Sequence, residues 1–204
     1  TMPVCVINQP AGLGDILWIQ PIVDDMIDRG YEVVYPVIDL YYEMVSRCIR
    51  KDGLRWVQET GEYPMKDCFS STSPTKREED LYLPIKYADQ HLPSCPVMIS
   101  KYYMVNIPVT NWHTHINFER DKDREDRVFE VYGIDKNVDY TLTNFTYGTP
   151  PNHITRDISV PPNHPVVEMS YEKDQENGIC LFDWIGVVEH AKEIHTIETA
   201  LCYL

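Results

Sequence analysis

The residues best suited to chemistry lie near the start of the chain, in Asn-Gln-Pro-Ala-Gly-Leu-Gly-Asp at residues 8–15. Gly12 and Gly14 can adopt backbone angles closed to other residues, and Asp15 places a carboxylate beside them. An apolar run at residues 4–7 precedes this turn and a helical pattern follows it. Unpaired N–H groups at the start of such a helix can hold a phosphate, so the turn predicts a binding site.

Asp15 has two possible roles in this turn. As a helix cap it would satisfy unpaired N–H groups and the helix dipole, whereas facing the crevice it would be a general base. The turn is not the dinucleotide-binding fingerprint, because it has two glycines and an acid where a small third residue is needed. A nicotinamide enzyme is therefore disfavoured.

The elements that must position this turn alternate between strands and helices. The apolar patterns predict strands at residues 4–7, 31–38, 54–57 and 81–85, and helices at residues 15–27, 40–49, 97–105 and 117–132. A long loop is expected over residues 58–79, where Gly, Pro, Ser and Thr accumulate. Gly133 ends this first half of the chain.

The alternation restarts after Gly133. Strands are predicted at residues 140–144, 166–169 and 193–195, and helices at residues 181–191 and 196–204. We therefore expect an α/β protein with two Rossmann-like lobes, residues 1–134 and residues 135–204, the second small or truncated. The last helix is apolar and uncapped at Leu204, which predicts that the native chain continues.

Composition restricts the class of protein. The 204 residues are 43% hydrophobic, and no segment approaches the roughly 20 consecutive apolar residues of a membrane helix. The six cysteines occur singly, and no charged-then-apolar leader is visible, which favours a cytoplasmic protein. The net charge of −14 argues against a nucleic-acid partner, but a few N–H groups and one or two cations can still hold a single sugar nucleotide.

Two other patterns suggest metal sites, and neither is favoured. Asp121 and Asp123 form an Asp-x-Asp pair, yet they lie in a mixed-charge run typical of a solvated helix start. His113 and His115 would share one face of a strand, but no third ligand has a recognisable spacing. No metal and no resident cofactor is therefore predicted, and Ser70 to Ser73 lack the elbow of a serine hydrolase.

Two segments of the chain, residues 8–17 and residues 181–200, resemble the glycosyltransferases of GT-B type, particularly heptosyltransferase-like enzymes and small bacterial or viral relatives. The resemblance implies an acceptor lobe, a nucleotide-sugar lobe and transfer of a sugar to a hydroxyl group. It makes Asp15 the candidate base, with Gly12 and Gly14 allowing the backbone to approach the sugar. The candidate donor contacts are Asn144, Gly148, His195, Thr196 and Thr199.

Transfer also requires positive potential at the leaving diphosphate. The candidate cations are Arg120, Arg124, Arg156 and Lys192, with Arg156 favoured because it lies in the irregular proline-rich crossing. The sequence thus predicts a metal-independent glycosyltransferase that uses a nucleotide sugar and a carbohydrate or other hydroxyl acceptor. The alternatives are a nucleotide-sugar epimerase-like enzyme, or a non-catalytic binding or assembly protein on the same scaffold.

Overall fold

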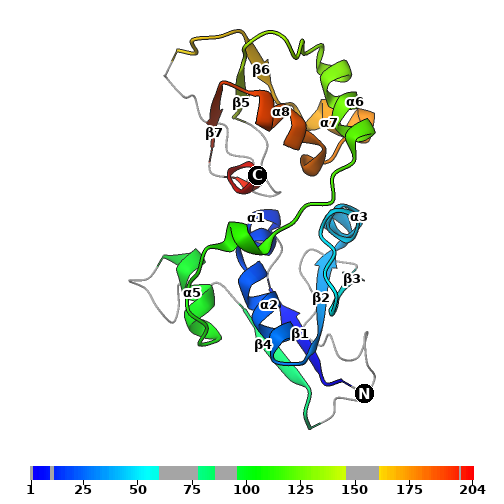
Figure 1. Cartoon of the computed structure of the whole chain (residues 1–204), viewed down its shortest axis with the longest axis vertical. Helices are drawn as coiled ribbons and strands as arrows, with labels where there is room; N and C mark the ends of the chain where they lie inside the picture. Colours follow the sequence, from blue (N-terminus) through cyan, green and yellow to red (C-terminus); the bar gives the residue numbers. More distant parts are fainter. Residues whose placement is uncertain (1, 10–11, 60–77, 86–95, 146–160, 198) are drawn as a thin grey trace. The chain divides into compact units, whose positions relative to one another are not determined.

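The computed structural model shows a mixed α/β protein whose strands form two parallel sheets (Figure 1). It describes residues 2–9, 12–59, 78–85, 96–145, 161–197 and 199–204. The chain divides into two compact units, Thr1–Glu119 and Arg120–Leu204, each described by itself below. The predicted α/β class with parallel strands is therefore confirmed.

The division falls earlier than residue 134, where the sequence predicted it. Helix α6 (Lys122–Tyr132) belongs to the second unit because it packs against α8 (Ile185–His190) and against the short 3-10 helix η2 (Leu181–Trp184). The charged residues at the start of α6 were interpreted from the sequence as solvated. Ion pairs from these residues instead help to attach α6 to α8 and η2. The helix start at residue 117 was also wrong, since Asp121 caps the helix by accepting from the Arg124 N–H at 3.1 Å.

The sheet of the first unit has the strand order β3-β2-β1-β4. Its strands are β1 (Val4–Asn8), β2 (Glu32–Ile38), β3 (Leu54–Glu59) and β4 (Leu81–Pro84), as predicted to within two residues. Neighbouring strands are parallel, with Val6 opposite Val34 on one side and Tyr82 on the other. Their carboxyl ends therefore share one edge, and Gln9 lies at that edge, directly after β1.

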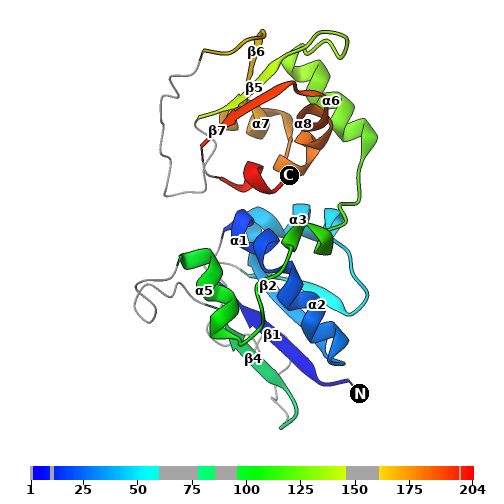
Figure 2. The same ribbon diagram turned by 60° about the vertical axis from the view of Figure 1, so that its left-hand side comes forward.

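Helices α1 and α2 run beside β1 and β2, and α5 lies beside them in both views (Figures 1 and 2). The helical elements of this unit are α1 (Leu13–Trp18), α2 (Gln20–Asp28), α3 (Asp39–Cys48), α5 (Val97–Met104) and the 3-10 helix η1 (Trp112–His115). The sequence predicted one helix where α1 and α2 stand. The chain breaks at Ile19 because Pro21 has no N–H to continue the first helix and instead begins the second.

The sheet of the second unit has the strand order β6-β5-β7, again parallel throughout. Its strands are β5 (Thr141–Asn144), β6 (Val166–Glu168) and β7 (Glu193–Thr196), which confirms the three predicted strands. The single helix predicted over residues 181–191 is divided between η2 and α8. Trp184 is fully buried at their junction.

Two expectations for the second unit were wrong. No helix begins at Thr196: that residue ends β7, the Ile197 N–H donates to the Asn144 carbonyl at 3.0 Å, and only the 3-10 helix η3 (Ala200–Tyr203) follows. Helix α7 (Tyr171–Asn177) was missed because its sequence lacks an apolar stripe. Its ends are nevertheless marked by Ser170, which caps the amino end, and by Gly178 with φ 64°.

Each unit has a core of buried apolar side chains. In the first unit these include Val6, Ile7, Leu17, Val34 and Ile85, and in the second Leu142, Met169 and Trp184, all at most 1% exposed. Among the described residues, no helix has the length and apolar character needed to cross a membrane.

Candidate functional site

The turn after β1 brings Asp15 back over Gly12. Gly12 precedes α1, and its carbonyl accepts from the Ile16 N–H at 3.0 Å. A Cβ at position 12 would stand 2.1 Å from Asp15 Oδ2, a distance at which no real contact exists. Gly12 has φ 166°, an extended conformation open to any residue, and Gly14 lies inside α1. Space for the Asp15 carboxylate, rather than an unusual backbone angle, therefore requires glycine at position 12.

The Asp15 carboxylate forms a buried ion pair with Lys101. Lys101 Nζ lies 3.0 Å from Asp15 Oδ1, and the exposed fractions of the two side chains are 0% and 15%. Burial lowers the pKa of Lys101 below its ordinary value, while the charge and hydrogen bonding of Asp15 act in the opposite direction. Asp15 thus has a cation beside one oxygen and retains some access to solvent.

Helix α5 carries Lys101 to this position through contacts with α1. The Trp18 indole N–H donates to the Met98 carbonyl at 2.6 Å, and the Tyr102 hydroxyl donates to the Trp18 carbonyl at 2.6 Å. The rings of Trp18 and Tyr102 also meet edge to face, with centroids 5.7 Å apart. Two segments 80 residues or more apart in sequence are therefore joined on both sides of Lys101.

Two further buried polar groups surround this pair. The pKa of Tyr35 is raised well above its ordinary value, first by burial and then by the charge of Asp15, while the Gln9 side chain opposes the shift. Gln9 is 1% exposed and Tyr35 is fully buried. The two groups are not aligned for a hydrogen bond, and neither has another partner among the described residues. Gln9 directly follows β1, Tyr35 lies within β2, Asp15 lies on α1 and Lys101 on α5, and these four residues are the polar cluster of this unit.

Three of the predicted donor residues come together in the second unit. The Asn144 side-chain amide donates to the hydroxyls of Thr196 and Thr199, both at 3.2 Å. Asn144 is fully buried at the end of β5, and Thr196 ends the neighbouring strand β7. The Thr199 hydroxyl also accepts from the Leu201 N–H at 3.4 Å and caps η3. These contacts explain why this end of the sheet is polar.

The remaining predicted donor residues are not joined to these three. His195 stands opposite Thr143 in the ladder between β5 and β7. Its side chain is partly buried, and its charge is among the influences that lower the pKa of Glu193. Gly148 and Arg156 lie outside the described residues, as do Ser70 to Ser73.

The candidate cations that the structure describes are engaged with carboxylates. Arg120 Nη1 donates to Glu189 at 2.6 Å, and Arg124 forms a two-point contact with Asp183 at 2.9 and 2.8 Å. The pKa of Arg120 is raised above its ordinary value first by its hydrogen bonds to Glu125 and then by the bond to Glu189. The bonds to Asp183 raise the pKa of Arg124. Lys192 is exposed and lies 3.7 Å from Asp139. Arg120 and Arg124 thus hold α6 to α8 and η2.

The patterns considered for metals have structural explanations. Asp121 caps α6, and His113 and His115 lie on the 3-10 helix η1 rather than on a strand, so that expectation was wrong. His115 Nδ1 lies 2.7 Å from Asp24, whose other oxygen accepts from Lys51 Nζ at 2.7 Å. Across the described ranges, no group of three or more His, Cys, Asp or Glu side chains is arranged to hold a metal.

Sequence reasoning found Asp15 but missed Lys101, Tyr35 and Gln9. Lys101 carried a signal, because it is the one charged residue in Val-Met-Ile-Ser-Lys-Tyr-Tyr-Met, an otherwise apolar and polar-neutral helix. A lysine in such a helix needs a buried partner or a path to solvent. Tyr35 and Gln9 carried no comparable signal, since tyrosine and glutamine are ordinary at a strand or at its end.

Comparison of the chain with models of known protein families, with curated proteins and with solved structures found no match. The function of this chain is therefore inferred from the geometry of the chain's own residues.

Proposed function

We propose that this chain is a glycosyltransferase of GT-B-like, two-lobed architecture. The first unit supplies the acceptor site and the second supplies the nucleotide-sugar site. The observation that carries the proposal is the Asp15 carboxylate, paired through one oxygen with a buried ammonium and packed over a glycine. In parallel α/β sheets ligands bind beyond the carboxyl ends of the strands, and Asp15 follows the carboxyl end of β1.

In this mechanism Asp15 accepts the proton of the acceptor hydroxyl. The acceptor oxygen forms a bond to the anomeric carbon of the donor while the bond from that carbon to the diphosphate oxygen breaks. Lys101 favours the ionised carboxylate that the step requires. The nucleoside diphosphate leaves with the electron pair, and the proposal assigns no metal to this step.

The donor site is proposed at Asn144, Thr196 and Thr199. Buried amide and hydroxyl groups at the carboxyl ends of neighbouring strands are suited to hydrogen bonding with a sugar nucleotide. The three side chains already bond one another, so binding would exchange these bonds for bonds to the ligand. Their convergence from positions 52 and 55 residues apart supports a shared role.

A ligand screen tests the donor site. We expect the unfolding midpoint of the full chain to rise with one of UDP, GDP, CDP or ADP, or with a sugar derivative of it, equally with and without EDTA. Asn144→Ala should abolish this rise. Thr141→Val is the matched control, because its hydroxyl bonds Glu193 at the other end of β5, and it should retain the response.

An acceptor assay with the identified donor tests the base. Asp15→Asn should lower transfer about 10³-fold while leaving the donor-induced midpoint shift intact, since general bases contribute 10² to 10⁴. Unchanged turnover would remove Asp15 from the mechanism, and conversion of the donor without any acceptor would indicate an epimerase-like enzyme. Absence of binding to every nucleotide would make the chain a non-catalytic protein on this scaffold.

A further inference from the structure

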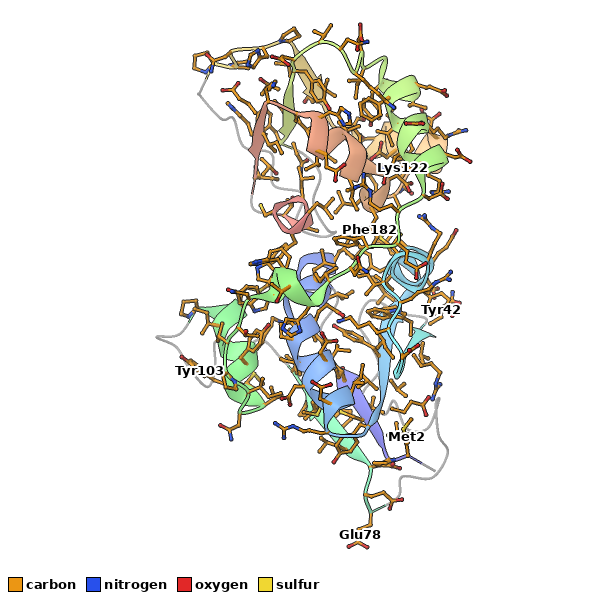
Figure 3. All side chains as sticks on the ribbon, viewed as in Figure 1. Met2, Tyr42, Glu78, Tyr103, Lys122 and Phe182 are labelled. Carbon is orange, nitrogen blue, oxygen red and sulfur yellow. The ribbon has the colours of Figure 1, made fainter. Side chains whose placement is uncertain are left out.

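Lys101 is a fully buried lysine on a helix that is otherwise free of charge. Tyr103, two residues later on α5, is 60% exposed and lies on the outer side of the helix (Figure 3). The long Lys101 side chain was therefore not forced inward by a lack of exposed surface on this helix. Burial of an ammonium group costs free energy unless a carboxylate compensates for it, and Asp15 is that partner.

The ion pair is not required to attach α5 to α1. Two hydrogen bonds and an edge-to-face ring contact already join these helices through Trp18, Met98 and Tyr102. A buried ion pair generally stabilises a fold no more than apolar residues of similar volume. A lysine at this position therefore calls for an explanation other than packing.

The placement of the two oxygens of the Asp15 carboxylate supplies that explanation. Asp15 Oδ1 is buried against Lys101, whereas Oδ2 lies over Gly12 at the turn. A cation fixed on Oδ1 orients the other oxygen of the carboxylate.

We propose that Lys101 is a positioning residue for Asp15, holding Oδ1 so that Oδ2 is directed to the acceptor hydroxyl. The inference rests on the proposed glycosyl transfer and deepens it by assigning the reactive oxygen. Lys101 itself touches neither substrate. Its effect on the reaction passes entirely through Asp15.

The test is a kinetic comparison of Lys101→Met with wild type. Without the buried cation Asp15 Oδ1 loses the group that fixes it, so kcat for transfer should fall about 100-fold. The KM for the donor should change little. Lys51→Met is the matched control, because Lys51 forms a similar part-buried pair with Asp24 at 2.7 Å away from the turn, and it should keep the wild-type kcat.

Further variants keep the result decisive if Lys101→Met does not fold. Lys101→Gln retains a polar side chain without the charge and should show the same loss of kcat. Asp15→Asn with Lys101→Met removes both charges and should fold without transferring sugar. A wild-type chain that transfers sugar, together with a folded Lys101 variant whose kcat matches wild type, would overturn the positioning role. A wild-type chain inactive with every donor would instead overturn the proposed function, and this inference with it.

Discussion

The two units each contain a buried aspartate, and the two differ in how their oxygens are used. Asp174 is fully buried and accepts from the Tyr132 hydroxyl at 2.7 Å and from the Trp184 indole N–H at 2.8 Å, one donor on each oxygen. Asp15 is paired with Lys101 through Oδ1, and its Oδ2 lies over Gly12. A carboxylate held by donors on both oxygens serves packing, whereas one with a cation fixed on one oxygen is suited to accept a proton at the other.

The surroundings of Asp174 support the structural interpretation. Burial raises the pKa of Tyr132 above its ordinary value, and Asp174 raises it further. The Tyr132 and Trp184 rings also meet edge to face, with centroids 4.6 Å apart. This cluster joins α6, α7 and η2, so its loss should affect folding rather than chemistry.

The largest expected effect is on stability at Asp174. Asp174→Ala leaves the buried Trp184 indole N–H without this acceptor and leaves the part-buried Tyr132 hydroxyl to the Ser170 carbonyl, so the free energy of unfolding should fall by about 3 kcal/mol. Urea denaturation measures this change. Asp126→Ala, which removes an exposed aspartate of the same unit, should leave the urea midpoint nearly unchanged. A loss below about 1 kcal/mol at Asp174 would contradict its structural role.

The next effect is on transfer at Gly12. Gly12→Ala places a methyl group where Asp15 Oδ2 stands, so the carboxylate must move, and transfer should fall about 100-fold. The donor-induced midpoint shift measures donor binding and should not change. In an Asp15→Ala background the same substitution should have no further effect on stability, because the clash is absent. Transfer within threefold of wild type would show that the turn has room for a side chain.

The smallest effect concerns the pH dependence of stability in Asp15→Asn. The folded-state pKa of Lys101 is already lowered by burial, and loss of Asp15 lowers it further. Between that lowered pKa and the ordinary 10.5 of lysine, the unfolded chain binds more protons than the folded one, so stability rises with pH. The free energy of unfolding of Asp15→Asn should therefore fall furthest below that of wild type near pH 7, and the difference between the two proteins should narrow by about 1 kcal/mol toward pH 10.

Urea denaturation at several pH values measures this narrowing. The double variant Asp15→Asn with Lys101→Met lacks the titrating amine, and its stability should not show this rise. A stability difference between Asp15→Asn and wild type that is constant from pH 7 to pH 10 would mean that Asp15 does not change the protonation of Lys101 in this range.

Most of the local structure was predictable from sequence. Parallel strands and most helices follow from apolar periodicity, and the ends of α6 follow from Asp121 and Gly133, which cap it with φ 65° at the glycine. The break between α1 and α2 at Ile19 was missed in the sequence analysis, although Pro21 indicates it. The helix expected after Thr196 did not form because the backbone there extends the ladder with β5.

The candidate site was predictable only in part. Gly12 and Asp15 stand three residues apart, so their proximity is a local property of the turn, and the sequence by itself determined it. Pairing of Asp15 with Lys101, and of Asn144 with Thr196, depends on which strands become neighbours and on which helix docks beside them. Periodicity and capping act over a few residues, whereas these contacts span 50 residues or more. The docking of α5 therefore sets Lys101 beside the Asp15 carboxylate, and this docking is a property of the tertiary structure.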